Sequence, residues 1–221
     1  LVAVNLGNEP SATPLKWREV PDLSVGASTT GTPGAFSNLK GSATGLSAVV
    51  TITASAVSVL NASNESKVLT GVSVTPSLAV SGVNGLDTGT SAANTWYYTY
   101  IIWNGTTTAG LISLSSTAPT MPSGYTHKCR VNSFRSDSTG NKFPLSFVQY
   151  GNDYQFVVAP GTNVAAGRVM ANGTAGNVNT PTYVSVATGA FVPPTASMIA
   201  VNVSAQSSLE ALVAPNASYG G

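Results

Sequence analysis

The chain has 221 residues, of which 8% are charged, and nine basic and eight acidic side chains leave a formal net charge of +1. Nine dispersed cations exclude a nucleic-acid binder, which needs clustered Lys and Arg to neutralise phosphates. Hydrophobic residues make up 43% of the chain, which excludes intrinsic disorder, and no apolar run is long enough to span a membrane.

The N-terminal 22 residues differ in character from the rest of the chain. They hold five of the 17 charged residues together with Trp17. We expect residues 1–22 to form a connector or a small N-terminal element, and residues 23–221 to form one β-sandwich domain.

Strand patterns dominate the body of the chain, and helical periodicity is almost absent. Alternating apolar positions and short runs rich in Val, Ile and Thr are interrupted by Gly, Asn, Ser and Pro about every ten residues. This pattern predicts an all-β, antiparallel, jelly-roll-like sandwich with little or no helix. The first expected strands lie within Leu46–Leu60, Lys67–Val74 and Ser77–Val83.

The middle of the chain predicts a five-strand antiparallel meander over residues 95–158. Trp96–Trp103 is dense in aromatic and β-branched residues, and Asn104-Gly105 after it is a strong hairpin signal. Strands then follow at about 106–114, 125–134, 143–150 and 154–158. The last two form a second hairpin across a Gly-Asn-Asp turn.

Strand 96–103 has large apolar side chains on both faces. Side chains alternate along a strand, so Tyr98 and Tyr100 point one way while Tyr97 and Ile101 point the other. A strand with one wet face alternates more cleanly. We therefore expect protein on both faces, from a second sheet or another subunit.

Downstream, the pattern weakens. Tyr183–Val192 and Ser197–Ser204 are expected strands, and Gly161–Pro181 is rich in Gly, Asn, Ala and Thr and is expected to be a long loop. The one candidate helix is Ser207–Val213, where a Ser precedes a short apolar segment.

The sequence offers little chemistry, and we expect no enzyme, no cofactor and no metal site. His127 and Cys129 would share one face of a strand, but neither an oxyanion motif nor an orienting carboxylate accompanies them, so packing roles are favoured over catalysis. Asp137 and Asp153 lie in turns, where Asp usually stabilises the backbone. Cys129 is the single cysteine, which excludes a disulfide framework and favours assembly in a reducing cytoplasm.

Aromatic rings near turns are the candidates for binding a ligand. Trp103 and Tyr125 are the best-placed residues for stacking on a sugar. The alternative is that both rings belong to the core or to an interface, as clustered Trp and Tyr in β-proteins usually do.

Two stretches of the sequence resemble virion proteins of tailed bacteriophages. The first runs through Asn84–Gly89, Ala93–Tyr97, Thr117–Tyr125 and Arg135–Asn141, in the order and spacing of a module that recurs in these virion proteins. The second, Asn5–Pro10 with Trp17, is similar to short elements that join shaft and head modules in phage tail fibres, although it lacks the aromatic residue usually found before the first Asn.

The resemblance implies a structural protein of the phage particle. It would assemble in the bacterial cytoplasm and lie on the particle exterior, as a homotrimeric tail-fibre or spike segment involved in host attachment. It would bind itself, other virion proteins and a host surface glycan or protein, without nucleic acid and without membrane insertion. A capsid decoration or head-fibre protein is the alternative hypothesis, and a polysaccharide depolymerase with two carboxylates in one cleft is the third.

Overall fold

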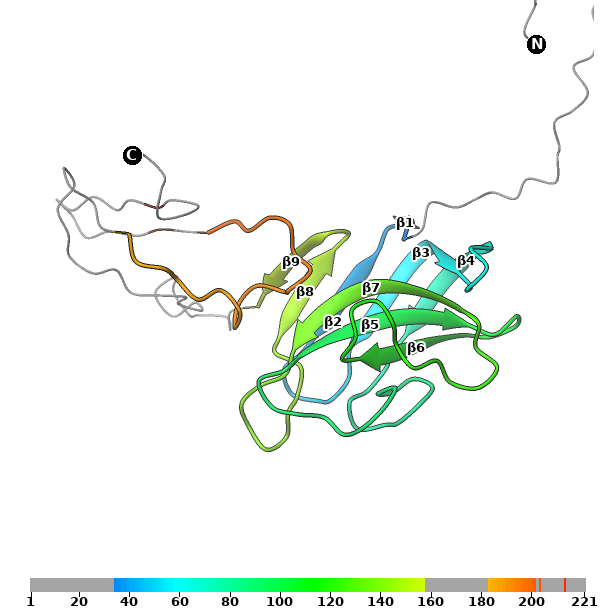
Figure 1. Cartoon of the computed structure of the whole chain (residues 1–221), viewed down its shortest axis with the longest axis horizontal. Helices are drawn as coiled ribbons and strands as arrows, with labels where there is room; N and C mark the ends of the chain where they lie inside the picture. The colour runs from blue at the N-terminus through cyan, green and yellow to red at the C-terminus, as the bar shows by residue number, and fades with distance from the viewer. Residues whose placement is uncertain (1–33, 158–182, 202, 204–212, 214–221) are drawn as a thin grey trace, which may run out of the picture.

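The computed structural model describes residues 34–157, 183–201, 203 and 213, which contain nine strands and no helix (Figure 1). All pairings between the named strands are antiparallel, so the predicted all-β antiparallel class is confirmed. Among these residues no helix has the length and apolarity to cross a membrane. The strands are β1 (Phe36–Ser37), β2 (Lys40–Ala43), β3 (Thr51–Leu60), β4 (Ser66–Val74), β5 (Trp96–Trp103), β6 (Thr108–Ser113), β7 (His127–Arg135), β8 (Phe147–Tyr150) and β9 (Asp153–Phe156).

The ten-residue strand β3 organises the sheet. One of its edges pairs with β4 over nearly its whole length. The opposite edge is shared in succession by β2, β1 and, through the single pair Leu60–Lys128, β7. The order along the sheet is β6-β5-β7-β3-β2-β8-β9, and Figure 1 shows β5, β6 and β7 passing in front of β3 and β4.

The main core lies between two parts of the sheet, one formed by β3 and β4 and the other by β5, β6 and β7. Aliphatic side chains of β3 and β4, such as Val57 and Leu69, meet aromatic side chains of β5, β7 and β8. A row of rings crosses the core with centroid separations of 5.7, 6.5, 4.9 and 5.3 Å between successive members. The row consists of Tyr97, Phe134, Phe147, Tyr154 and Phe156.

The predicted meander is wrong in its pairing order, although all five of its strands and both hairpins are present. β7 pairs with β5 instead of β6, and β8 pairs with β2 instead of β7. The loop 114–126 carries the chain from β6 across to the other edge of β5. The first hairpin turns through Asn104–Thr107, where the Asn104 Oδ1 atom accepts hydrogen bonds from two backbone N–H groups of the turn.

Both faces of β5 are buried, as the sequence predicts, and within this chain. Tyr97 and Ile101 belong to the main core. Tyr98, Tyr100 and Ile102 form a second cluster on the other face with residues of β6, and Met121 and Tyr125 of the loop 114–126 pack against it. The loop thus covers the face for which a second sheet or subunit was expected.

Three expected strands do not form among the described residues. Residues 77–83 make tight turns, because Gly82 has a positive φ and its N–H bonds to the Leu86 carbonyl. Residues 183–192 and 197–201, together with Val203, are not in strands either. The expected connector 1–22 and loop 161–181, and all but the last residue of the expected helix 207–213, lie outside the described residues.

Candidate functional site

Trp103, the first sugar-binding candidate, packs against other residues of its own chain. It lies at the end of β5, partly buried, and packs against the main core. The Lys67 Nζ atom lies 5.5 Å from the centroid of its ring, and the His127 ring approaches edge-on at a centroid distance of 5.0 Å. The ring therefore has a clear packing role.

Tyr125, the second candidate, lies on the opposite side of β5. It is partly buried and packs against the second cluster, whereas Trp103 packs against the main core. Their main chains are close, because the Thr126 N–H donates to the Trp103 carbonyl at 3.1 Å. The sheet nevertheless separates the two rings, so they do not form one stacking platform.

His127 and Cys129 share a face of β7, as predicted, but have separate environments. The His127 Nδ1 atom lies 2.9 Å from the Thr126 hydroxyl. Cys129 is buried and its thiol donates to the Arg130 carbonyl at 3.5 Å. Burial raises the pKa of the Cys129 thiol to about 11, which disfavours the thiolate that a nucleophile requires.

A shallow groove lies on the outer face of β7, over the pair Lys128 and Arg130. Because they are two positions apart in a strand, their side chains share a face. The Arg130 Nη1 atom donates to the Ser116 carbonyl at 2.8 Å, and Lys128 Nζ donates to the Thr117 carbonyl at 3.3 Å. Asn61, Leu60 and Tyr100 also line this groove of about 430 Å³, which has no acidic lining residue.

The aromatic residues of the sequence do not indicate this basic groove. Its signal in the sequence is Lys128-Cys129-Arg130, a pair of cations at strand spacing in a chain with few charges. The groove offers an anionic group two cationic head groups held by backbone carbonyls. The same contacts fasten the loop 114–118 to β7.

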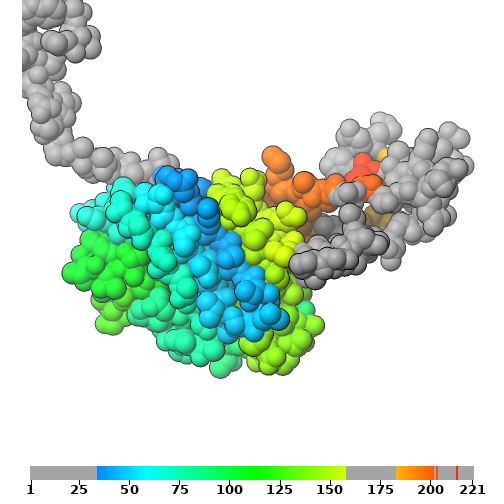
Figure 2. Space-filling model, turned by 180° about the vertical axis from the view of Figure 1, so that it is seen from behind, coloured from blue at the N-terminus to red at the C-terminus, as the bar shows by residue number. Residues whose placement is uncertain are grey.

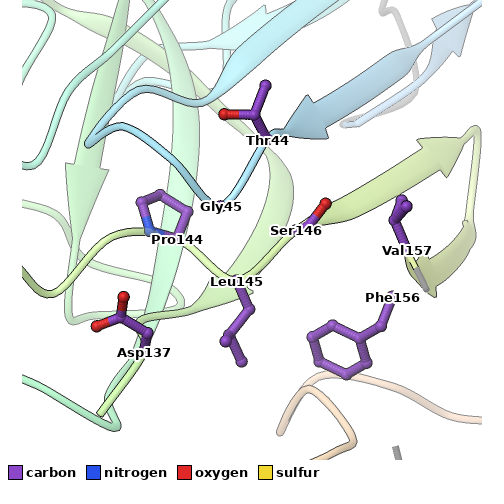
Figure 3. Close-up of a pocket in the computed structure, with 8 residues that line it drawn as sticks. All are labelled: Thr44, Gly45, Asp137, Pro144, Leu145, Ser146, Phe156 and Val157. Atoms are coloured by element: carbon purple, nitrogen blue, oxygen red, sulfur yellow. The ribbon is translucent and has the colours of Figure 1, made fainter. Parts of the chain in front are cut away.

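A second cleft, of about 370 Å³, lies between the end of β2 and the approach to β8 (Figure 3). Its only acidic lining residue is Asp137, and its apolar lining includes Leu145 and Phe156. The Asp137 Oδ1 atom accepts hydrogen bonds from the N–H and the hydroxyl of Thr139, both at 2.9 Å. Asp137 thus stabilises its turn, as its sequence position indicates.

Neither groove brings two carboxylates together. Asp153 is exposed at the start of β9, where it pairs with Tyr150. No group of three or more His, Cys, Asp or Glu able to hold a metal ion occurs in the part of the chain that the structure describes.

Hydrogen bonds join the four segments compared with the phage module in two pairs, the first with the third and the second with the fourth. In the first segment, the Asn84 N–H and Oδ1 both bond to the backbone of Gly110 in β6 at 2.8 Å. Asp87 Oδ2 accepts from the Thr120 N–H at 2.8 Å, which ties the first segment to the third.

The second segment docks against the fourth in the same manner. The Ser136 hydroxyl donates to the Ala92 carbonyl at 2.7 Å and accepts from the Thr95 N–H at 3.0 Å. The Asn94 N–H bonds to the Asp137 carbonyl at 2.9 Å. These bonds join residues that are far apart in the sequence, such as Thr95 and Ser136.

Comparison of the chain with protein-family models, curated proteins and solved structures returns no match.

Proposed function

We propose that the chain is a structural protein of a bacteriophage particle, namely a tail-fibre or spike segment that takes part in host attachment as a homotrimer. The observation that supports this proposal is the pairing of the segments just described. The four segments that resemble the phage module form two hydrogen-bonded pairs, one through Asp87–Thr120 and the other through Ser136–Thr95 and Asn94–Asp137. The spacing of the segments in the sequence therefore brings the two members of each pair into contact.

The distribution of charge supports a role in assembly. Only four charged residues occur between residues 23 and 127, a stretch that includes β1–β6. A surface poor in Lys, Glu and Asp resembles the core of a protein interface, from which charged residues are depleted. Trimerisation would then add weak host contacts together through a high effective concentration.

Immunogold electron microscopy of particles, with an antibody raised against residues 34–157, tests the proposal. We expect gold on the tail or its fibres. Gold distributed over the shell would overturn the tail assignment in favour of the alternative, a capsid decoration or head-fibre protein. Particles without label, in a preparation whose tail and shell proteins react with their own antibodies, would overturn both.

A further inference from the structure

Three Asn-Gly pairs occur in the chain, and the structure gives two of them opposite environments. In this dipeptide the side-chain amide can react with its own main chain, because glycine leaves its nitrogen unhindered and its backbone free to turn. The two pairs are Asn84-Gly85, in the loop between β4 and β5, and Asn104-Gly105, in the turn between β5 and β6. The third, Asn172-Gly173, lies outside the described residues.

The side-chain oxygen of Asn104 accepts three hydrogen bonds from the turn that this residue begins. The donors are the Thr106 N–H at 3.0 Å, the Thr106 hydroxyl at 3.1 Å and the Thr107 N–H at 2.7 Å. This is an Asx turn, in which the side chain folds back over the peptide bond that follows it. The amide carbon Cγ of Asn104 is thereby held close to the Gly105 nitrogen.

The Gly105 nitrogen is free to react. Gly105 is exposed, with a φ of 103°, and no atom lies within 4 Å of a Cβ built on it. Its N–H donates to no acceptor in the part of the chain that the structure describes. Figure 1 shows the β5–β6 turn at the end of the sheet away from β8 and β9, and green atoms form the left edge of the molecule in Figure 2.

The donors of the Asx turn also stabilise the reaction that this geometry permits. When a nitrogen attacks an amide carbon, negative charge develops on the amide oxygen. Hydrogen-bond donors at about 2.7–3.1 Å from that oxygen stabilise the charge, as in the oxyanion hole of an enzyme. The turn of Asn104 therefore combines a nucleophile, a carbonyl carbon and an oxyanion hole within four consecutive residues.

Asn84 has the same neighbour but none of these features. Its Oδ1 atom accepts from the Gly110 N–H at 2.8 Å, in β6, so its side chain is held by another segment of the chain. The Gly85 N–H donates to the Gly82 carbonyl at 2.9 Å. Gly85 is buried, and a Cβ there would overlap the Val80 carbonyl. The chain thus contains its own unreactive control.

We propose that Asn104 is a self-modification site, whose side-chain amide reacts with the Gly105 nitrogen to form a succinimide. The nitrogen gives its proton to water or hydroxide and bonds to Cγ, the Cγ–Nδ2 bond breaks, and the amide nitrogen takes up a proton and leaves as ammonia. Water then opens the ring. Addition at Cγ gives aspartate, and addition at the main-chain carbonyl gives isoaspartate. Neither step needs an oxidant or a reductant.

The modification changes the charge of the hairpin tip. A neutral amide becomes a carboxylate, so the formal net charge of the chain falls from +1 to zero. Aspartate keeps the acceptor oxygen, and Asp-Gly favours the same kind of hairpin as Asn-Gly. Isoaspartate adds one carbon to the main chain beside the pair Trp103–Thr108, which closes the hairpin. Only the aspartate product is therefore compatible with the present turn.

Peptide mapping by mass spectrometry of the full chain, incubated at mildly alkaline pH in water enriched in heavy oxygen, tests the site. In the folded chain we expect Asn104 to convert at least about tenfold faster than Asn84, because only Asn104 has a free nucleophile and an oxyanion hole. In urea the two residues should convert at similar rates, since unfolding removes both environments. Equal rates for the two residues in the folded chain would overturn the proposal.

Two neighbouring threonines separate the oxyanion hole from the sequence effect of glycine. Thr106→Val removes the hydroxyl donor to Asn104 and should slow the conversion about fivefold, the value of one hydrogen bond. Thr107→Val is the matched control, because the Thr107 side chain makes no hydrogen bond with the described residues and its N–H remains. It should convert like the wild type. Equal rates for the two variants, with unchanged urea midpoints, would show that the turn does not promote the reaction.

Discussion

The side-chain amides of Asn132 and Gln149 hydrogen-bond to each other in the core, although their strands, β7 and β8, do not pair in the sheet. Gln149 Nε2 also donates to the carbonyls of Val131, at 3.0 Å, and Gly151, at 2.7 Å. Thr99 Oγ1 of β5 lies 3.5 Å from Asn132 Oδ1. This buried polar network bridges the two parts of the sheet where β7 diverges from β3.

Replacing the Gln149 amide should therefore destabilise the fold strongly. Gln149→Leu keeps the approximate volume but removes the partner of the buried Asn132 amide and of the buried Val131 carbonyl, at about 1–3 kcal/mol for each buried unsatisfied group. We expect a loss of about 3 kcal/mol in the free energy of unfolding, measured in urea. Gln155→Leu, at an exposed position of β9, is the control and should change it by less than about 0.5 kcal/mol. Equal effects would show that the network adds no stability.

Gly85 should be intolerant of any side chain. A Cβ atom there would lie 2.2 Å from the Val80 carbonyl oxygen, so the backbone would have to move. Gly85 also accepts a hydrogen bond from the Ile112 N–H at 2.7 Å, which holds this loop against β6. Gly85→Ala should cost about 2–3 kcal/mol, as overpacking does.

Gly140 provides the matched control for this substitution. No heavy atom lies within 4 Å of a Cβ built there, and its φ is not positive. Gly140→Ala should change the free energy of unfolding by less than about 1 kcal/mol. If thermal denaturation gave equal midpoints for the two variants, the close approach at Gly85 would not matter for stability.

Local pattern predicted the strands better than their partners. The expected strand 96–103 has the bounds of β5, because aromatic and β-branched side chains and an Asn-Gly turn are local signals. Which edge of β5 receives β7 depends on the path of the loop 114–126. That path depends on contacts such as Met121 with the second cluster, which no sequence window contains.

The same limit applies to the candidate site. Alternation along β5 correctly placed Tyr98 and Tyr100 opposite Tyr97 and Ile101. It did not place Tyr125, which lies in a loop whose position is set by tertiary contacts.

Stability should fall at high pH because two buried groups favour their neutral forms. Burial raises the pKa of Cys129 from 9.0 to about 11 and that of Tyr100 from 10.0 to about 12. Below pH 9 both groups are protonated in the folded and the unfolded chain. As pH rises from 9 to 12, the unfolded chain releases protons that the folded chain retains, so the free energy of unfolding decreases.

The cysteine accounts for a defined part of this decrease. Its raised pKa corresponds to about 2–3 kcal/mol, lost between pH 9 and 11. In urea titrations at several pH values, the free energy of unfolding of Cys129→Ala should decrease less between pH 9 and 11 than that of the wild type, whatever the stability of the variant at pH 7. If the free energy of unfolding decreased equally with pH in the variant and the wild type, Cys129 would not be a source of the decrease.

The contact between Trp96 and Gly189 should hold the C-terminal arm, residues 183–201, in place without stabilising the sheet. Trp96→Phe keeps a large aromatic ring but removes the Nε1–H donor to the Gly189 carbonyl. One hydrogen bond contributes about 1 kcal/mol net, so exchange of the Phe191 and Val192 amides should accelerate about fivefold. Hydrogen–deuterium exchange mass spectrometry measures this, while the urea midpoint of the sheet should stay nearly constant.

Trp103→Phe is the control. It perturbs the packing against Lys67 and His127 and should lower the urea midpoint while leaving exchange in the arm unchanged. Faster exchange in the arm of both variants would indicate that general loosening of β5, and not the loss of this bond, releases it.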